Sequence, residues 1–233
     1  MPCTLPASLA DAAVCRGSFH AVLGGEVEDT AFADFSAALQ KAQAEGRILT
    51  ASLFRYENHL FFYAEGLNRP FTPQGLCPAL DAALLPWPPA LGEAEPRPWA
   101  AMQPYFYHDV PTTAADWQQG RCPQRRRGRI ALLPPDRWCS YMEHHLRIVT
   151  EGLVEGDRWH LICVQEGVLF SYLEEPRTNV NIRHQPGAHS PELDAWIAAD
   201  PESHFARFTP EQKANPDSGH NFVFLPRIAG TED

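Results

Sequence analysis

Residues 129–175 read RIALLPPDRWCSYMEHHLRIVTEGLVEGDRWHLICVQEGVLFSYLEE, and this stretch decides the fold. In its first half, large apolar residues recur every three or four positions, which is typical of a helix. Gly152 follows directly, as glycine often does where a helix ends. Glu166-Gly167 separates two strand-like runs, which predicts a hairpin. The stretch therefore predicts a strand, a helix and two further strands, at 129–135, 136–151, 158–164 and 168–174.

The first half of the chain repeats this order. The motif LFFY at 60–63 recurs as LFSY at 169–172, and similar segments in the same order indicate an internal repeat. The matching elements of the first half are predicted as a strand at 19–25, a helix at 30–45 and strands at 48–56 and 59–65. Each half then continues with a helical segment and an aromatic strand, at 81–85 and 104–109 in the first half and at 192–199 and 221–227 in the second.

The order strand, helix, strand, strand, helix, strand is ferredoxin-like. Helices on one face of such a sheet leave the other face apolar, and two such faces can bury each other. We therefore predict an α+β fold in which two ferredoxin-like repeats are fused into one pseudo-symmetric α+β barrel. The predicted parts are an N-terminal extension at 1–18, a diverged first repeat at 19–110, a linker at 111–127 and a second repeat at 128–233.

Composition and charge exclude several classes of protein. The 233 residues are 44% hydrophobic, enough for a packed core, and 19 Lys and Arg against 29 Asp and Glu give a net charge of −10. This charge disfavours nucleic-acid binding, and no apolar run is long enough for a membrane span. The N-terminal residues lack the features of a secretory signal, so we expect a cytoplasmic protein. The arginines at 125–129, beside Pro and Gly, are interpreted as part of a solvated linker.

The cysteines and histidines form no metal-binding motif. Six scattered cysteines contain no Cys-x-x-Cys pair, and ten histidines contain no His-Glu-x-x-His. The chain also lacks a glycine-rich phosphate loop. We therefore expect neither a metal nor an organic cofactor.

The second half resembles the L-rhamnose mutarotase family over residues 129–228. The resemblance is carried by Tyr141-x-x-x-His145, by the hairpin at 159–175 and by Ala-Asn-Pro-Asp at 214–217, in this order. It implies an isomerase of carbohydrate metabolism that needs no cofactor. Such an enzyme would interconvert the anomers of a reducing, rhamnose-like sugar by opening and reclosing its ring.

The resemblance also implies roles for individual residues. His145 would be the general acid, and Tyr141 would contact the sugar. The family's other substrate-binding positions fall on His160 or Trp159, and on His204 and Phe205.

The residues themselves are compatible with proton transfer. Positions i and i+4 share one helical face, and a histidine that titrates near neutrality can serve as acid or base. For His145, a core histidine bonded to a backbone carbonyl is the alternative. Only one of His160 and Trp159 can face the interior of an alternating strand. In the first half Phe35 and Leu39 stand at the matching helix positions, so any chemistry should be confined to the second half.

Two other functions compete with the mutarotase interpretation. One is a cofactorless oxygenase or lyase of the α+β barrel type, which would need a larger apolar cavity for an aromatic substrate. The other is a non-catalytic module that binds a small ligand, in which His145 would be hydrogen-bonded internally. In every case we expect a monomer or weak homodimer, because the fusion supplies in one chain the partner that small barrels find in another.

Overall fold

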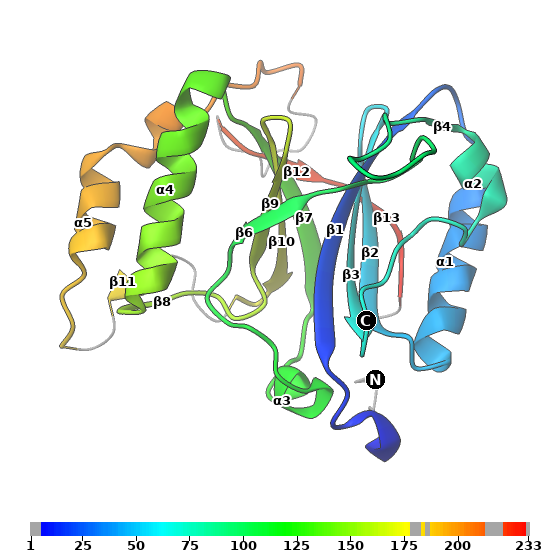
Figure 1. Cartoon of the computed structure of the whole chain (residues 1–233), viewed down its shortest axis with the longest axis horizontal. Coiled ribbons are helices and arrows are strands. Elements are labelled where there is room, and N and C mark those ends of the chain that lie inside the picture. The colour runs from blue at the N-terminus through cyan, green and yellow to red at the C-terminus, as the bar shows by residue number, and fades with distance from the viewer. Residues whose placement is uncertain (1–5, 178–182, 185–186, 213–220, 232–233) are drawn as a thin grey trace. The chain divides into compact units, whose positions relative to one another are not determined.

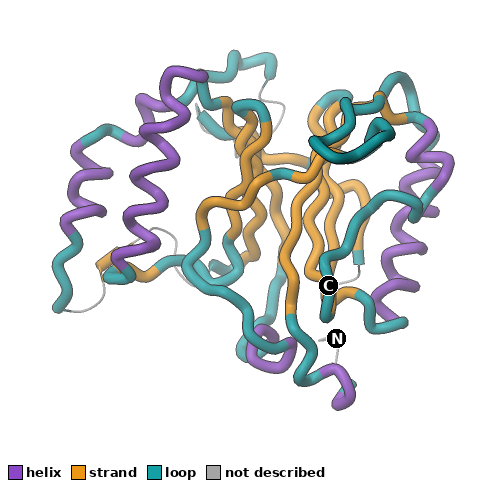
Figure 2. Tube along the Cα trace, viewed as in Figure 1, coloured by secondary structure: helices purple, strands orange, loops and turns teal. Residues whose placement is uncertain are grey.

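The structure is a computed structural model that describes residues 6–177, 183–184, 187–212 and 221–231 (Figure 1). The chain forms two compact units. Unit 1 comprises Met1–Met102, Pro111–Pro123 and Pro226–Asp233, and unit 2 comprises Gln103–Val110 and Gln124–Leu225. Each unit combines an antiparallel sheet with helices (Figure 2), so the predicted α+β class is confirmed.

In unit 1 the strands are ordered β13-β2-β3-β1-β4, and β5 also pairs with β1. The strands of this sheet are β1 (Val14–Leu23), β2 (Ile48–Tyr56), β3 (His59–Leu67), β4 (Leu84–Leu85), β5 (Ala100–Ala101) and β13 (Arg227–Gly230). The helices of the unit are the 3-10 turn η1 (Ala7–Leu9), α1 (Asp29–Ala44), α2 (Pro78–Ala82) and α3 (Ala114–Gln118).

Helix α1 covers one face of this sheet with an entirely apolar surface. Phe32, Phe35, Leu39 and Ala42 follow the helical period and lie in a core that also holds Phe62 of β3. The helix predicted at 30–45 is thus confirmed to within one residue at each end.

In unit 2 the strands are ordered β12-β7-β10-β9-β6, and β8 and β11 form a separate pair. The strands are β6 (Gln103–Phe106), β7 (Arg125–Leu132), β8 (Val154–Glu155), β9 (Leu161–Gln165), β10 (Val168–Glu175), β11 (Arg183–His184) and β12 (Val223–Leu225). The helices are α4 (Pro135–Glu151), α5 (Pro191–Ala198) and the 3-10 turn η2 (Pro201–His204). Helix α4 packs on α5 and on β6. Among the described helices of the chain, none has both the length and the apolar character of a membrane span.

Two terminal strands lie in a different unit from the one predicted. The aromatic strand at 104–109 was expected to close the first half, but β6 pairs with β9 of unit 2. After β12 the chain continues into β13, which pairs with β2 of unit 1. The compact units therefore do not follow the predicted boundary at 111–127. The local sequence predicts that a segment forms a strand, but it does not predict which sheet edge the strand joins.

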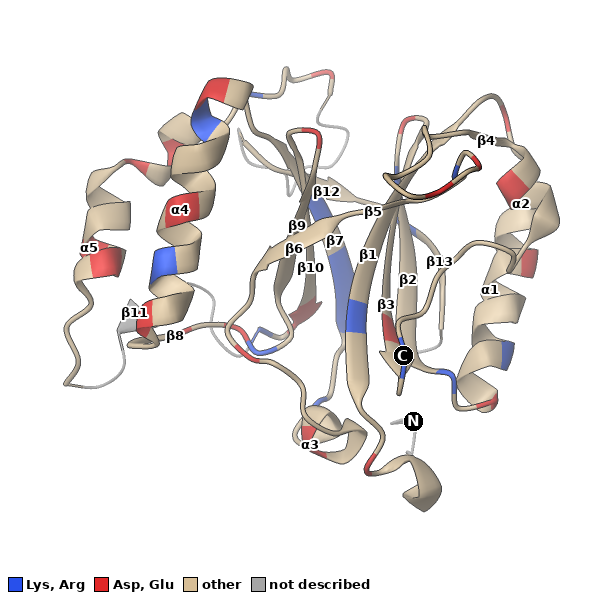
Figure 3. Cartoon of the chain, viewed as in Figure 1, with Lys and Arg blue, Asp and Glu red and all other residues tan. Residues whose placement is uncertain are grey.

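The arginine run is a strand and not a solvated linker. Arg126 and Arg127 lie in β7, opposite β10. Arg126 Nε lies 3.7 Å from a carboxylate oxygen of Glu174, and Arg127 Nη1 lies 3.0 Å from one of Glu175. Acidic residues on the neighbouring strand thus compensate the positive charge. Figure 3 shows this basic stretch along β7.

A buried polar network ties β3 of unit 1 to the segment at 111–123. The Tyr63 hydroxyl donates to Glu65 Oε1 at 2.7 Å, and Arg121 donates two bonds to the same carboxylate, at 2.7 and 2.9 Å. Burial alone would raise the pKa of Glu65, but the Arg121 guanidinium outweighs burial and holds this pKa below its ordinary value. In unit 2, Tyr172 donates to Glu174 in the same way, at 2.6 Å.

We predict that Arg121→Met destabilises the fold by about 3–5 kcal/mol at pH 7, because it leaves the Glu65 carboxylate buried without its counter-ion. Arg47→Met, which removes an exposed partner of Glu45, should cost less than about 1 kcal/mol. Urea denaturation of the three proteins measures both effects.

The same urea denaturation, repeated at lower pH, tests the direction of the pKa shift of Glu65. A carboxylate with a lowered folded pKa stabilises the fold above its unfolded pKa, and this stabilisation is lost as the pH falls through the folded value. The penalty of Arg121→Met should therefore shrink in acid. Equal penalties for Arg121→Met and Arg47→Met at pH 7 would contradict this account of the network.

Candidate active site

Helix α4 brings Tyr141 and His145 together. The helix begins at Pro135, which suits the first turn, and ends where Gly152 adopts a left-handed conformation with φ 68°. Its buried residues are Tyr141, His145 and Ile148, which share one face. The Tyr141 and His145 ring centroids lie 4.3 Å apart. The i, i+4 spacing in the sequence therefore brings the two side chains into contact, as predicted.

Aromatic rings from several elements of unit 2 surround this pair. The His145 ring lies 4.7 Å from Trp196 of α5, 4.8 Å from Phe106 and 5.7 Å from Tyr105, both of β6. Phe205 lies 5.1 Å from Tyr141 and 5.0 Å from Phe222. We call this set the aromatic cluster; its members are Tyr105, Phe106, Tyr141, His145, Trp196, His204, Phe205 and Phe222.

The hydrogen bond of His145 fixes its tautomer. Its Nδ1 lies 2.9 Å from the backbone carbonyl oxygen of Tyr141. A carbonyl oxygen can only accept, so Nδ1 carries the proton and donates, and Nε2 of the neutral ring keeps a lone pair. Burial lowers the pKa of His145 to about 4, against a small opposing effect of this hydrogen bond. At neutral pH the residue is therefore an uncharged base that presents Nε2.

The tyrosines of the cluster are kept protonated. Burial raises the pKa of Tyr141 to about 12, although Tyr105 and Arg129 act in the opposite direction. Burial also raises the pKa of Tyr105 well above its ordinary value. Both hydroxyls are hydrogen-bond donors across the physiological range.

Arg129 is a member of this neighbourhood that the sequence analysis missed. Its guanidinium carbon lies 4.3 Å above the ring of Phe222. Burial lowers its pKa to about 10, which leaves it charged at neutral pH. The alternation of side chains along β7 could have identified it. Arg129 shares a strand face with Ala131, which packs in the core beneath the helices. Trp196 lies in the helical segment predicted at 192–199, but the sequence did not identify it as a neighbour of His145.

Of the other predicted site residues, some belong to the aromatic cluster and others do not. His204 and Phe205 belong to the aromatic cluster, and His204 Nε2 lies 3.3 Å from the Ser140 hydroxyl. The His160 ring lies at the edge of the aromatic cluster, with its centroid 6.1 Å from that of Phe106. Trp159 is buried too but is not a member.

Both residues of the pair at 159–160 are buried and precede β9, where alternation starts, so burial does not distinguish which of them faces inward. The Ala-Asn-Pro-Asp motif at 214–217 lies outside the described residues.

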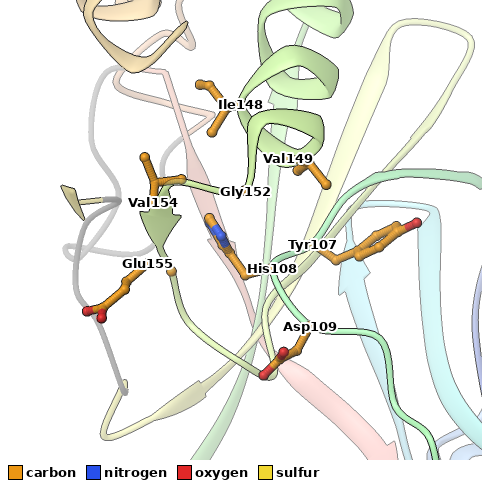
Figure 4. A pocket seen from close by; sticks show the side chains of 9 residues that line it. Tyr107, His108, Asp109, Ile148, Val149, Gly152, Val154 and Glu155 are labelled. Carbon is orange, nitrogen blue, oxygen red and sulfur yellow. The ribbon is translucent and has the colours of Figure 1, made fainter. Parts of the chain in front are cut away.

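A polar pocket of about 300 Å³ lies at the C-terminal end of α4 (Figure 4). His108 and Asp109 line it from the end of β6, Ile148 from α4, and Glu155 and Gly156 from β8 and the residue after it. Gly156 makes room for the His108 ring, because a Cβ there would lie 1.7 Å from the ring. Burial lowers the pKa of His108, which favours its neutral form.

The described part of the chain contains no group of three or more His, Cys, Asp or Glu side chains arranged to hold a metal ion. The His145 ring has Trp196 and Phe106 against it.

Comparisons with known proteins find no matching protein-family model and no matching curated protein. Solved structures with low similarity include a proposed monooxygenase from Lactobacillus acidophilus, 6% identical, covering 94% of this chain and 96% of that one with a TM-score of 0.42. A proposed monooxygenase from Fusobacterium nucleatum is 9% identical, covers 94% of each chain and has a TM-score of 0.40. An anthrone oxidase-like protein is 8% identical, covers 92% of each chain and has a TM-score of 0.38.

The resemblance to the L-rhamnose mutarotase family is therefore corrected. No family model supports it, and these solved structures are monooxygenase-like or oxidase-like by description, not mutarotases. The expectations of an isomerase, of rhamnose and of carbohydrate metabolism were wrong with it.

We predict that His145 titrates with a midpoint near pH 4, below the ordinary value of 6.5. Because the unfolded chain then binds more protons than the folded one between these values, the free energy of unfolding should fall as the pH drops through this window. Nitrogen-detected NMR of labelled histidine, assigned with His145→Asn, should show protonated Nδ1 and unprotonated Nε2. A midpoint near 6.5, or the opposite tautomer, would show that this description of His145 is wrong.

Proposed function

We propose that the chain is a cofactor-free oxygenase that acts on an aromatic compound with an acidic C–H bond, with His145 as the general base. One observation carries the proposal: a neutral histidine with a defined Nε2 lone pair is buried among aromatic rings. An apolar pocket was the expectation for an oxygenase and a polar pocket the expectation for a sugar site, and the rings around His145 make its surroundings apolar. The rings of Phe106 and Trp196 would contact the flat faces and edges of such a substrate.

The proposed reaction converts a methylene group next to an aromatic carbonyl into a second carbonyl. His145 Nε2 removes one proton, and the resulting carbanion is rich enough in electrons to reduce molecular oxygen directly and form a C–O bond. The protonated imidazole returns its proton to the peroxide. Loss of the remaining C–H proton with cleavage of the O–O bond then releases water, so CH₂ and O₂ become C=O and H₂O.

A binding module without catalysis is the second candidate. The internal hydrogen bond from Nδ1 to Tyr141 favours it, since that bond also suits a structural histidine. The two candidates differ in what Nε2 does, and turnover distinguishes them. A cytoplasmic location and the absence of a cofactor stay predictions for either.

We also propose that each unit is a ferredoxin-like repeat and that the helix-free faces of the two sheets meet as one barrel. The strand orders support this proposal, because each sheet contains the sequence 4-1-3-2 of its strands, as β4-β1-β3-β2 and as β12-β7-β10-β9. The large side chains on the face of β3 opposite α1, such as Phe61, support it too, since an apolar face needs a cover.

Replacement of His145 by Asn should reduce turnover by roughly 10²- to 10⁴-fold, the usual contribution of a positioned general base. Oxygen consumption with anthrone and related aromatic methylene compounds measures the rate. The matched control is His189→Asn, which changes an exposed histidine of the same unit and should leave the rate unchanged. A folded His145→Asn protein with the wild-type rate would exclude the proposed mechanism, and no oxygen consumption by the wild type with any such compound would favour the binding module.

The barrel proposal has its own test in solution. If the two units supply each other's cover, the chain should behave as a monomer or weak dimer at micromolar concentration. Multi-angle light scattering measures the mass directly. An obligate tetramer would count against the fused barrel.

A further inference from the structure

Arg129 is a cation without a hydrogen-bonding partner in the described part of the chain. Its Nε is buried and makes no hydrogen bond to any described residue. No described carboxylate forms an ion pair with it, although Arg126 and Arg127 on the same strand both have one. The side chain as a whole is half-buried, but a polar atom that is shielded from water and makes no hydrogen bond is costly for the fold. A residue that is kept at such a cost is a candidate for ligand binding.

Arg129 lies on the strand face that packs toward Tyr141, and its charge acts on Tyr141 and Tyr105. Ala131 and Leu133 follow on the same face of the chain and pack in the core with Tyr141 of α4. From Phe222, on which Arg129 stacks, ring contacts run continuously to the aromatic cluster: Phe222 to Phe205 at 5.0 Å, Phe205 to Tyr141 at 5.1 Å and Tyr141 to His145 at 4.3 Å.

Two phenolic donors share this neighbourhood. The Tyr105 and Tyr141 rings lie 6.0 Å apart, edge to face. The Tyr105 hydroxyl is buried and makes no hydrogen bond to a described residue, so its proton can be donated to a third group. The Glu202 carboxylate acts electrostatically on both Arg129 and Tyr141 but forms no ion pair with the guanidinium. A cation and a hydroxyl donor that are not paired with a carboxylate are the groups that stabilise an oxyanion.

We infer that Arg129, with a hydroxyl of the Tyr105–Tyr141 pair, forms an oxyanion site for an aromatic phenolate or enolate. The inference rests on the proposed function and narrows its substrate class to compounds in which the ionised oxygen is conjugated to the reacting carbon. It also removes a difficulty of the mechanism, because a buried histidine is a weak base. Removing a proton from carbon becomes favourable when the negative charge is delocalised onto an oxygen beside Arg129.

Binding of 4-nitrophenol tests the site without turnover. Its absorbance reports ionisation directly, and it has no acidic C–H bond for the proposed oxidation. Wild-type protein should lower the apparent pKa of the bound phenol by about one unit, which is a roughly tenfold larger ratio of phenolate to phenol at a fixed acidic pH. Arg129→Met should abolish this shift, Arg129→Lys should retain part of it, and Arg147→Met, which removes an exposed arginine of α4, should leave it unchanged.

Stability separates a ligand role from a structural one. Arg129→Met removes an unpartnered cation, so its urea midpoint should be equal to or higher than that of the wild type, whereas loss of a structural arginine would lower it. If Arg129→Met does not fold, Arg129→Gln replaces it in the binding experiment. An unshifted phenol in the wild type, or an equal shift in the wild type and the neutral variants, would overturn the inference.

The two proposals can fail separately. His145→Asn should still shift the ionisation of 4-nitrophenol, because the base does not hold the oxyanion. A phenolate shift without oxygen consumption would reject the oxygenase and support the anion site. Oxygen consumption that is unchanged in Arg129→Met would reject the anion site and support the oxygenase.

Discussion

The alternation of side chains along β7 is the constraint on which the second unit depends. Every second residue of this strand faces the helices, so Arg129 and Ala131 lie beneath α4 while Arg126 pairs with Glu174 on the opposite face. A shift of one residue would exchange the two faces and break both sets of contacts. The same register therefore fixes the apolar core, the ion pairs and the position of the unpartnered guanidinium.

The helix layers of the two units have diverged in chemistry. In unit 1 the positions that match Tyr141 and His145 are Phe35 and Leu39, and the core around them consists of hydrophobic residues. In unit 2 the helix layer holds a neutral imidazole, and Arg129 of β7 adds a cation on the sheet beside it. Burial explains the states of both, since it lowers the pKa of His145 to about 4 and that of Arg129 to about 10. A weak base and an oxyanion partner complement each other in removing a proton from carbon.

Periodicity made most of the secondary structure predictable. The helices at 30–45 and 136–151 and the strand at 48–56 were predicted to within one residue, because each has a strong local pattern. The exchange of β6 and β13 between units was not predictable, since the choice of sheet edge is a long-range property. The linker interpretation failed for a similar reason, because the acids that compensate the arginines lie some fifty residues later, on β10.

The candidate site was predictable only in part. The spacing of Tyr141 and His145 identified the helix face, but the aromatic environment depends on Phe106 and Trp196, which reach it from β6 and α5. The family resemblance pointed to His204 and Phe205, which do join the cluster, yet it suggested the wrong chemistry. Residues near a site can thus be found from sequence while their surroundings, which set the pKa and the ligand, cannot.

Crystallography of the protein with 4-bromophenol tests the central claim most directly, because the anomalous signal of bromine locates the ring independently of the protein. The phenol oxygen should lie within hydrogen-bonding distance of Arg129 and the ring against the aromatic cluster, on the Nε2 side of His145. A bromine signal confined to other parts of the molecule, or an Arg129 guanidinium paired with a carboxylate of the chain, would contradict it.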